Sequence, residues 1–406
     1  MKKEKKLNIA KIWDFIDKHH FLIYFIVITI FSIIVRYLLI KYHSGDYDMF
    51  LKPWFDELKI NGGLMGLSKN IGNYTPIYMT ILSILTYLPI DSLVSIKLVS
   101  ITFDYIAAFF LFKIVMELLK NKKSNKKIAL IVYTLYLFLP TVFLNSAYWA
   151  QSDIIYTCFI LISIYYLLKQ DFKKSIIFFS IALAFKFQAI FVFPLYVLVY
   201  IANHKEIKLR YFLIIPLVIF ICSIPKICFS HNLLEGFEVY FNQSNTYSNY
   251  LTLNLPNFYS IYLKGLSSNP NLIETPFKEM GTIGIIVTLV IFAIIAFLVY
   301  QNKTKFSKQT IIEFALWSSL ITTFFLPQMH ERYLFVGDII SIIYLVINKK
   351  KYYIPILIQF ISLNGYMYLL FSGFAINMTL LSIIYFITLI LYTKDMYIKY
   401  FKKEFV

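Results

Sequence analysis

The sequence has few cysteines, few residues that break helices, and little charge. Only 3 of its 406 residues are cysteine, and glycine and proline number 12 each. Cys158, Cys222 and Cys228 all lie in or beside apolar runs, so they cannot form a disulfide framework and are expected to pack as small side chains. Charged residues make up 15% of the chain, whereas an ordinary globular domain has about a quarter. This shortage of charge excludes a soluble globular protein.

Apolar residues take the place of the missing charge along the whole chain. They account for 59% of the sequence, and the mean hydropathy is +0.69. Because a membrane-spanning helix needs about 20 apolar residues, we predict an all-α polytopic membrane protein with about 10 crossings and a single domain over 1–406. The expected spans are 21–42, 92–118, 128–144, 152–168, 211–228, 283–300, 311–326, 333–347, 353–372 and 378–392.

The basic residues indicate how the chain is oriented. A net charge of +17 would suggest nucleic acid as the partner of a soluble chain, but here the lysines gather in short segments at 2–18, 120–127 and 349–351. Cytoplasmic loops of membrane proteins are enriched in lysine and arginine. We therefore expect both termini to be cytoplasmic, with the lipid bilayer and no nucleic acid as a partner. The bias toward lysine, isoleucine and asparagine suggests a bacterial plasma membrane.

Two long segments, 43–73 and 230–279, are expected on the external side. Within the first, Pro53 suits the start of a helix whose apolar and charged residues follow a helical period. We expect this helix to lie flat on the outer membrane surface. The apolar stretch 75–88 is predicted to be a short re-entrant or surface helix, because a further full crossing would place the next basic loop on the wrong side.

The stretch 175–202 has basic loops on both sides but is too short for two full spans. We predict a broken helical hairpin whose halves meet at 186–188, where irregular backbone must face protein or a wet cavity. Lys186 is either a cation that lines a cavity for an anionic group, or a lysine whose stem reaches back to an interface. The other charged residues within apolar runs are expected mainly to be buried pairs or helix-end groups: Arg36, Asp104, Glu313 and Asp338.

Four short polar segments are expected at the ends of helices on the external side. They are 45–48 (Gly-Asp-Tyr-Asp), 73–76 (Asn-Tyr-Thr-Pro), 148–153 (Tyr-Trp-Ala-Gln-Ser-Asp) and 329–333 (Met-His-Glu-Arg-Tyr). A carboxylate in one external loop is usually only solvated. Because the four segments share one side, we expect them to surround a common cavity.

Such a cavity suits a transfer in which a hydroxyl loses its proton while a phosphate departs. Asp46 would accept the proton, and His330 and Arg332 would stabilise the charge on the phosphate. Trp54, Tyr74 and Trp149 would stack on sugar faces. No metal or other cofactor is expected, because no cysteine cluster and few histidines accompany the acids; metal binding by the aspartates of 45–48 is the less favoured alternative.

These segments resemble the GT-C membrane glycosyltransferases that use polyprenyl-phosphate sugars, and in particular the dolichyl-phosphate-glucose glucosyltransferase branch and its bacterial relatives. Segment 45–48 followed by Trp54 is similar to that family's GDYE…W segment, and 73–76 is similar to its Y-P-P element. The segments 149–153, 186–188 and 329–332 resemble its F-Q-Y-N-like, K-Q and histidine-glutamate elements. Ile77 replaces the second proline and Asp48 replaces a glutamate, which weakens the assignment of a particular sugar.

The resemblance implies an inverting transfer of a sugar from a polyprenyl-phosphate donor to a cell-surface glycan or lipid-linked acceptor, as in cell wall polysaccharide biosynthesis. Asp46 would be the general base, with Asp48 in reserve. Lys186 would join His330 and Arg332 in contacting the lipid phosphate. The resemblance also implies that Gln151 and Asp153 orient acceptor or sugar. Other residues of the matched segments are expected to bind substrate: Glu331, Gln188, Tyr74 and Trp54.

Two other classes of protein use similar features. A transporter or flippase for a lipid-linked glycan also contains broken helices with a lysine at membrane depth. The lack of internal repeats and the long first external segment argue against this class. A polymerase or ligase that joins whole lipid-linked glycans shares the transfer chemistry and stays open.

Overall fold

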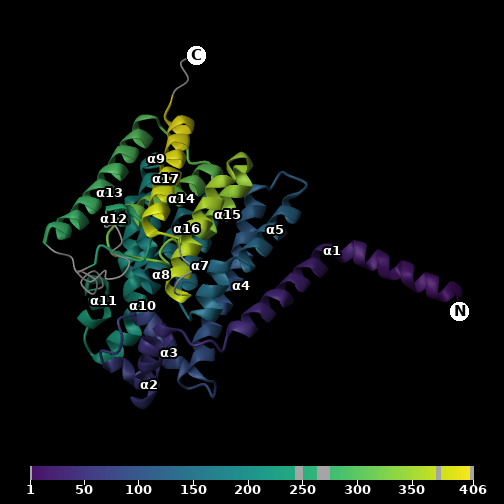
Figure 1. Cartoon of the computed structure of the whole chain (residues 1–406), viewed down its shortest axis with the longest axis horizontal. Helices are drawn as coiled ribbons and strands as arrows, with labels where there is room; N and C mark the ends of the chain where they lie inside the picture. Colours follow the sequence, from purple (N-terminus) through teal and green to yellow (C-terminus); the bar gives the residue numbers. More distant parts are fainter. Residues whose placement is uncertain (1, 243–249, 263–274, 372–375, 403–406) are drawn as a thin grey trace.

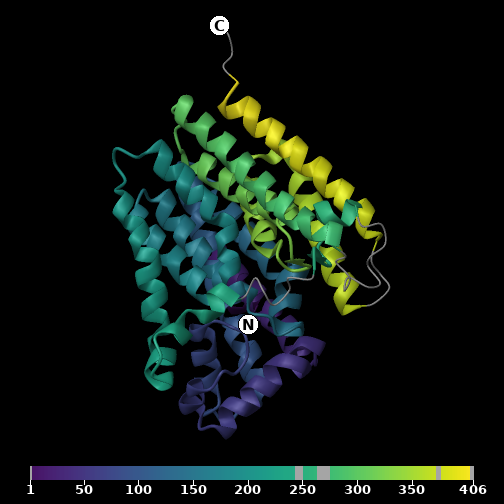
Figure 2. The ribbon, with the colours of Figure 1, turned by 90° about the vertical axis from the view of Figure 1, so that its left-hand side faces the viewer.

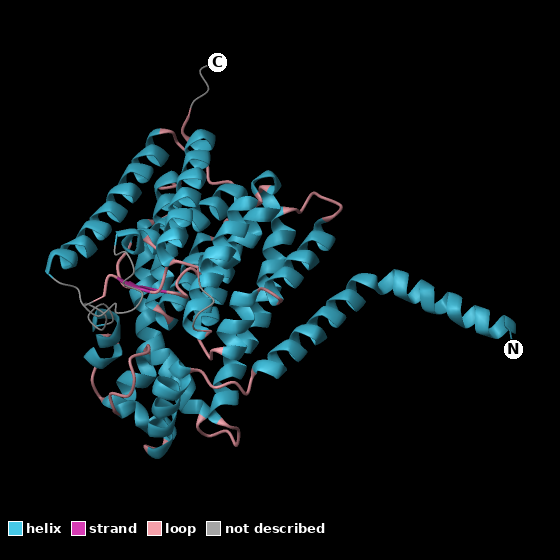
Figure 3. Ribbon diagram, in the orientation of Figure 1, coloured by secondary structure: helices cyan, strands magenta, loops and turns pink. Residues whose placement is uncertain are grey.

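The computed structural model describes residues 2–242, 250–262, 275–371 and 376–402, which form a helical bundle (Figures 1 and 3). Among these residues, the strands are β1 (Thr252–Leu253) and β2 (Met329–His330), which pair in parallel. The predicted all-α architecture is confirmed. The helices are α1 (Lys2–Leu39), α2 (Lys52–Ile60), α3 (Pro76–Leu85), α4 (Ser92–Leu118), α5 (Asn125–Leu137), α6 (Pro140–Phe143), α7 (Asp153–Leu168), α8 (Phe172–Phe185), α9 (Phe193–Ala202), α10 (Ile214–Ser230), α11 (Glu238–Asn242), α12 (Phe258–Tyr262), α13 (Thr275–Gln301), α14 (Lys308–Phe325), α15 (Phe335–Ile347), α16 (Tyr353–Leu370) and α17 (Met378–Tyr400).

Six helices of the described chain are long and apolar enough to cross a membrane, so the protein is a multi-pass membrane protein. A seventh span arises if α5 and the segment Pro140–Tyr148 are counted together across their 50° bend. Pro140 accounts for this bend, because proline has no backbone N–H to donate and its ring disturbs the preceding turn. The larger predicted number of crossings stays a prediction. The six spans are Asp14–Leu39, Ser92–Leu118, Leu209–Ser230, Glu279–Gln301, Tyr353–Leu370 and Met378–Tyr400.

The helices α4, α7 and α14 bring polar groups to the same two ends of the bundle. At one end, Glu117 of α4 contacts the ammonium groups of Lys169, after α7, and Lys308, which begins α14, both at 2.5 Å. At the other end, Ser92 of α4 contacts the Tyr47 hydroxyl at 2.7 Å. The helices α4 and α7 therefore run in the same direction and α14 runs in the opposite one. The polar segments 45–48 and 148–153 lie at the end away from Glu117.

Short helices of the segment 44–85 form one end of the molecule, the purple and blue region at the bottom of Figure 2. The helix α2 begins next to Pro53, as the sequence predicted. Its buried face carries Phe55 and Leu58. On its exposed face, Lys52 and Asp56 form an ion pair of 2.7 Å. The chain turns after α2 at Gly62, whose φ of 81° favours glycine. The predicted helix in the first long loop is confirmed, and its position at a membrane surface stays a prediction.

The helix breaks at 186–188 as predicted, and the position of this break within the membrane stays a prediction. The helix α8 ends at Phe185, and Lys186 has an extended backbone with φ −157° and ψ 127°. The chain then folds back, because the rings of Phe179 in α8 and Tyr196 in α9 lie 4.3 Å apart. The hairpin begins slightly earlier than predicted, at 172, because the Asp171 side chain caps α8.

Two of the charged residues within apolar helices, Arg36 and Glu313, have partners of opposite charge, as a buried charge requires. Arg36 Nε donates to Asp104 Oδ2 at 2.8 Å, and both side chains are buried. Glu313 accepts hydrogen bonds from Lys399, which explains why α17 continues beyond the predicted span to Tyr400. Asp338 accepts a hydrogen bond of 2.6 Å from the Ser362 hydroxyl.

The second predicted external segment, 230–279, falls partly outside the described residues, at 243–249 and 263–274. Its described part includes β1, whose Leu253 lies opposite His330 of β2. The helix α13 begins within this segment, earlier than the predicted 283. This loop therefore pairs with the late polar segment 329–333 through backbone hydrogen bonds.

Candidate active site

Asp46 lies in the helical turn before α2, and three donors converge on one of its oxygens. Oδ2 accepts hydrogen bonds from Trp149 Nε1 at 3.1 Å and Gln151 Nε2 at 2.5 Å, and Arg332 Nη1 lies 3.9 Å away. Among the described residues, Oδ1 has no hydrogen-bond partner. The carboxylate is therefore fixed through one oxygen while the other can still accept a proton.

An unusual backbone brings these donors to Asp46. Trp149 and Gln151 flank Ala150, whose φ of 67° lies in the left-handed region that residues other than glycine rarely adopt. A π-helical segment, 144–148, precedes them, and another, 47–51, follows Asp46. π-Helical segments are rare in proteins, but those that occur are often found at functional sites. A strained backbone conformation persists only where the surrounding structure holds it in place. The local conformation therefore favours a functional role for this corner of the molecule.

A buried network of charges lies next to Asp46. Asp153 Oδ1 accepts a hydrogen bond of 2.6 Å from Lys186 Nζ, and its Oδ2 accepts one of 3.0 Å from Asn145. Arg332 Nε lies 3.4 Å from the same Oδ2. The Asp153 side chain is 0% exposed, and its contacts are with Lys186, Asn145 and Arg332. Asp153 therefore positions the cations of Lys186 and Arg332, and its expected role toward acceptor or sugar stays a prediction.

The segment after α14 contains a neutral histidine, His330, and two charged residues, Glu331 and Arg332. Burial, and then the charge of Arg332, lower the pKa of His330 below its ordinary value, so the imidazole is neutral at neutral pH. Burial alone would raise the pKa of Glu331, but the nearby His330 ring, 3.7 Å away, and the charge of Arg332 lower it, which keeps this carboxylate ionised. Arg332 Nη1 donates to Glu331 at 2.7 Å, and its guanidinium lies 5.2 Å from the Trp149 ring centre. Glu331 therefore holds Arg332 in a fixed position.

Two cavities meet at this network. The carboxylate cavity, of about 180 Å³, is lined by Asp46, Trp54, Gln151 and Glu331 among others. The apolar cavity, of about 460 Å³, runs along 186–191 and the loop after α14. Four residues line both cavities: Asn73, Tyr74, His330 and Arg332.

Most of the predicted site residues come together, but Asp48 does not. Its side chain is 51% exposed and contacts His43 Nδ1 at 3.1 Å, and it lines neither cavity. Its reserve role as a base is therefore not supported by its position. Gln188 lines the apolar cavity and donates to the Tyr333 hydroxyl at 2.7 Å. Among the described residues, no group of three or more His, Cys, Asp or Glu side chains is arranged to hold a metal ion.

The sequence interpretation missed two contributors to this site. Asn145 carries no charge, and the only signal for it was its place in the predicted external segment that leads to Gln151. Leu253 has no motif around it, yet its carbonyl accepts the Glu331 N–H at 2.9 Å and holds the late polar segment. Trp149 was expected only as a sugar-stacking ring, whereas its indole N–H holds Asp46.

We expect the neutral His330 to reduce stability in mild acid. The unfolded chain takes up a proton at this histidine as the pH falls through about 6.5, whereas the folded protein does so only at a lower pH. The folded state therefore loses stability over this range. The melting temperature of His330→Gln should fall less between about pH 7.5 and 5.5 than that of the unmodified protein, whereas His204→Gln, in an exposed loop, should behave like the unmodified protein. Equal losses in all three proteins would contradict the prediction.

No family model matches the chain, and no curated protein matches its sequence. Its function must therefore be inferred from the site itself. The features available for this are an anchored carboxylate with one open oxygen, two buried cations, and an apolar cavity that shares a wall with the carboxylate.

Proposed function

We propose that the protein is an inverting glycosyltransferase of the GT-C type, which moves a sugar from a polyprenyl-phosphate donor to a glycan or lipid-linked acceptor. One observation carries the proposal: Asp46 and Arg332 line the same cavity, and Arg332 also lines the adjoining apolar cavity. A base and a cation at this junction match a reaction that removes a proton on one side and releases a phosphate on the other.

In this reaction the acceptor hydroxyl enters the carboxylate cavity and gives its proton to Oδ1 of Asp46. The acceptor oxygen forms a bond to the anomeric carbon from the face opposite the phosphate. The bond between that carbon and the phosphate oxygen breaks, and its electron pair leaves with the lipid phosphate. Trp149 and Gln151 hold Asp46 through Oδ2, which leaves Oδ1 directed to this task.

The apolar cavity suits the lipid-linked donor. Phe187, Ile190 and Phe191 offer apolar contacts to a hydrocarbon chain, and Lys186 lies at the same cavity. One of the three N–H groups of Lys186 donates a hydrogen bond to Asp153. Arg332 Nη2 has no hydrogen-bond partner among the described residues. Both cations therefore retain donors for a phosphate that enters with the lipid.

The proposed membrane orientation gives a separate prediction. The site would face the outside of the plasma membrane and both termini the cytoplasm. In a background with the native cysteines replaced by serine, Asn73→Cys should react with an impermeant maleimide added to intact cells, and Lys123→Cys should react only after the membrane is opened. Both positions are exposed. Labelling of the two from the same side would overturn the orientation.

The direct test supplies the purified protein with undecaprenyl-phosphate sugars in lipid vesicles. Transfer of the sugar with release of undecaprenyl phosphate would support the proposal. Movement of intact lipid across the vesicle without cleavage would support a flippase instead, and transfer of a whole glycan chain would indicate a polymerase or ligase. Mass spectrometry of lipid that copurifies with the protein would identify the donor class independently.

A further inference from the structure

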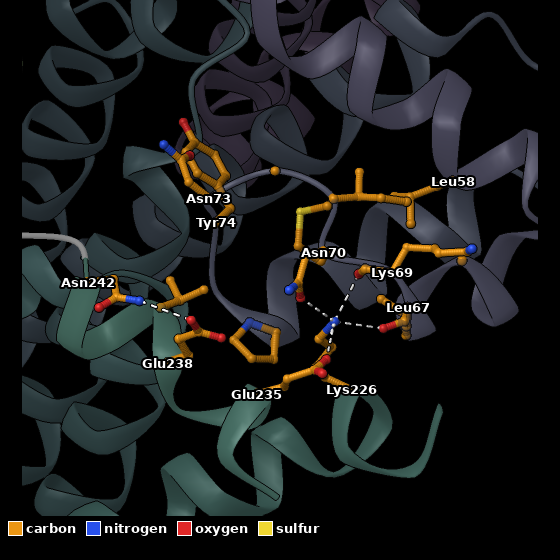
Figure 4. Close-up of a pocket in the computed structure, with 16 residues that line it drawn as sticks. Leu58, Leu67, Lys69, Asn70, Asn73, Tyr74, Lys226, Glu235, Glu238 and Asn242 are labelled. Carbon is orange, nitrogen blue, oxygen red and sulfur yellow. Dashed lines mark hydrogen bonds and ion pairs between the residues drawn. The ribbon is translucent and has the colours of Figure 1, made fainter. Parts of the chain in front are cut away.

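A third cavity, of about 250 Å³, adjoins the proposed active site (Figure 4). We call it the side cavity. It shares Asn73 and Tyr74 with the carboxylate cavity. One wall comes from residues 58–79, and the other comes from the end of α10 and from α11. None of the steps described above uses this cavity.

The lysine at the centre of the side cavity is fully engaged. An ammonium group has three N–H donors, and Lys226 Nζ donates to Leu67 O and Lys69 O, both at 2.9 Å, and to Asn70 Oδ1 at 3.4 Å. Glu235 Oε2 lies 3.0 Å from the same ammonium group and forms an ion pair with it. Lys226 therefore clamps the loop before α3 onto α10. Its charge is neutralised by Glu235 and is not free for an anionic ligand.

The remaining charges make the side cavity unsuited to anions. Figure 4 shows the Lys69 side chain extending away from Glu238. Glu238 lines the opposite wall, where its Oε1 accepts a hydrogen bond of 3.2 Å from Asn242. Once Lys226 and Glu235 are paired, Glu238 gives this wall a negative charge. A carboxylate or phosphate on a ligand would be repelled there.

We propose that the side cavity binds a neutral sugar unit of the acceptor, an inference that rests on the proposed glycosyl transfer. Carboxylate and amide groups such as Glu238 and Asn70 can accept hydrogen bonds from sugar hydroxyls, and amides can also donate them. Tyr74 and Val239, which line the cavity and are half-buried, supply apolar contacts for the C–H face of a ring. The volume is below the range of about 300–1,000 Å³ usual for drug-sized ligands, which suits one sugar unit.

Tyr74 connects the side cavity to the base. Its ring packs against Trp54 with 5.3 Å between centres, and its hydroxyl lies 3.5 Å from Gln151 Oε1. Gln151 in turn donates to Asp46. A glycan that extends past Tyr74 from the side cavity would therefore enter the carboxylate cavity, where its terminal hydroxyl meets the base.

Binding of short glycosides to the full-length protein tests this inference without requiring catalysis. The probes are butyl glycosides of glucose, galactose, mannose and N-acetylglucosamine, with the butyl glucuronide and galacturonide as charged counterparts. Saturation-transfer NMR in nanodiscs should detect at least one neutral glycoside, with the uronides bound about tenfold more weakly. Glu238→Lys should reverse this preference, because it replaces the negative charge with a positive one. Glu57→Lys, at an exposed position that lines none of the three cavities, should leave it unchanged.

Three outcomes would overturn the side-cavity inference: no glycoside binds, the uronides bind as well as the neutral glycosides, or Glu238→Lys and Glu57→Lys behave alike. Sugar transfer from undecaprenyl-phosphate donors is measured separately. If transfer occurs while the NMR prediction fails, the glycosyltransferase proposal stands and the side cavity has another role. If no donor is cleaved, the proposed function fails whatever the glycosides do.

Discussion

Replacing Asp46 by asparagine should reduce sugar transfer by about 10²–10⁴-fold, the contribution usual for a general base. The asparagine side chain keeps an oxygen that can accept the hydrogen bonds from Trp149 and Gln151, but it cannot take a proton from the acceptor. The loss should therefore appear in kcat, with the donor KM nearly unchanged. Initial rates at saturating donor, compared with the melting temperature of the same preparation, measure the effect.

Asp48→Asn is the matched control, since the two aspartates are two residues apart and undergo the same chemical change. Asp48 contacts His43 at an exposed position and lines neither cavity of the proposed site, so its variant should transfer sugar at nearly the normal rate. If Asp46→Asn retains normal turnover, Asp46 is not the base. If Asp48→Asn alone is inactive, the reserve candidate must take its place.

Arg332→Lys should lower the transfer rate by about 10²–10³-fold, the effect of removing one preorganised donor from a developing negative charge. Lysine keeps the positive charge, which avoids the cost of leaving Asp153 and Glu331 without it. However, lysine cannot contact Glu331 and Asp153 and still present a separate planar N–H to a phosphate. Because the phosphate gains charge as it leaves, kcat should fall more than the donor affinity does.

Arg210→Lys provides the control for this exchange, because Arg210 is exposed in the first turn of the span Leu209–Ser230 and lines none of the cavities described above. Its rate and donor KM should match those of the unmodified protein. A normal rate for Arg332→Lys would show that the guanidinium geometry plays no part in the departure of the phosphate. An equal fall in both variants would point to a general intolerance of this exchange.

Lys186 shows why part of the site was predictable from sequence. A charge in an apolar run is costly unless it has a partner or a wet cavity. The position of Lys186 in such a run was therefore enough to indicate a site residue. The same reasoning indicated the hairpin break, because basic loops flank a stretch too short for two spans. The partner was not predictable: Asp153 is 33 residues away in sequence, and no local pattern connects the two.

The sequence by itself determined the membrane class, the helical architecture and the polar segments from which the site is built, because apolar length and the cost of buried charge are local properties of the chain. The tertiary structure decided which members of those segments face the cavities. Asp46 and Asp48 are two residues apart in a helical turn and therefore point in different directions, and only packing determines which direction leads inward. Likewise, His330 pairs with Leu253 across 77 residues, and such pairing depends on contacts that no local segment encodes.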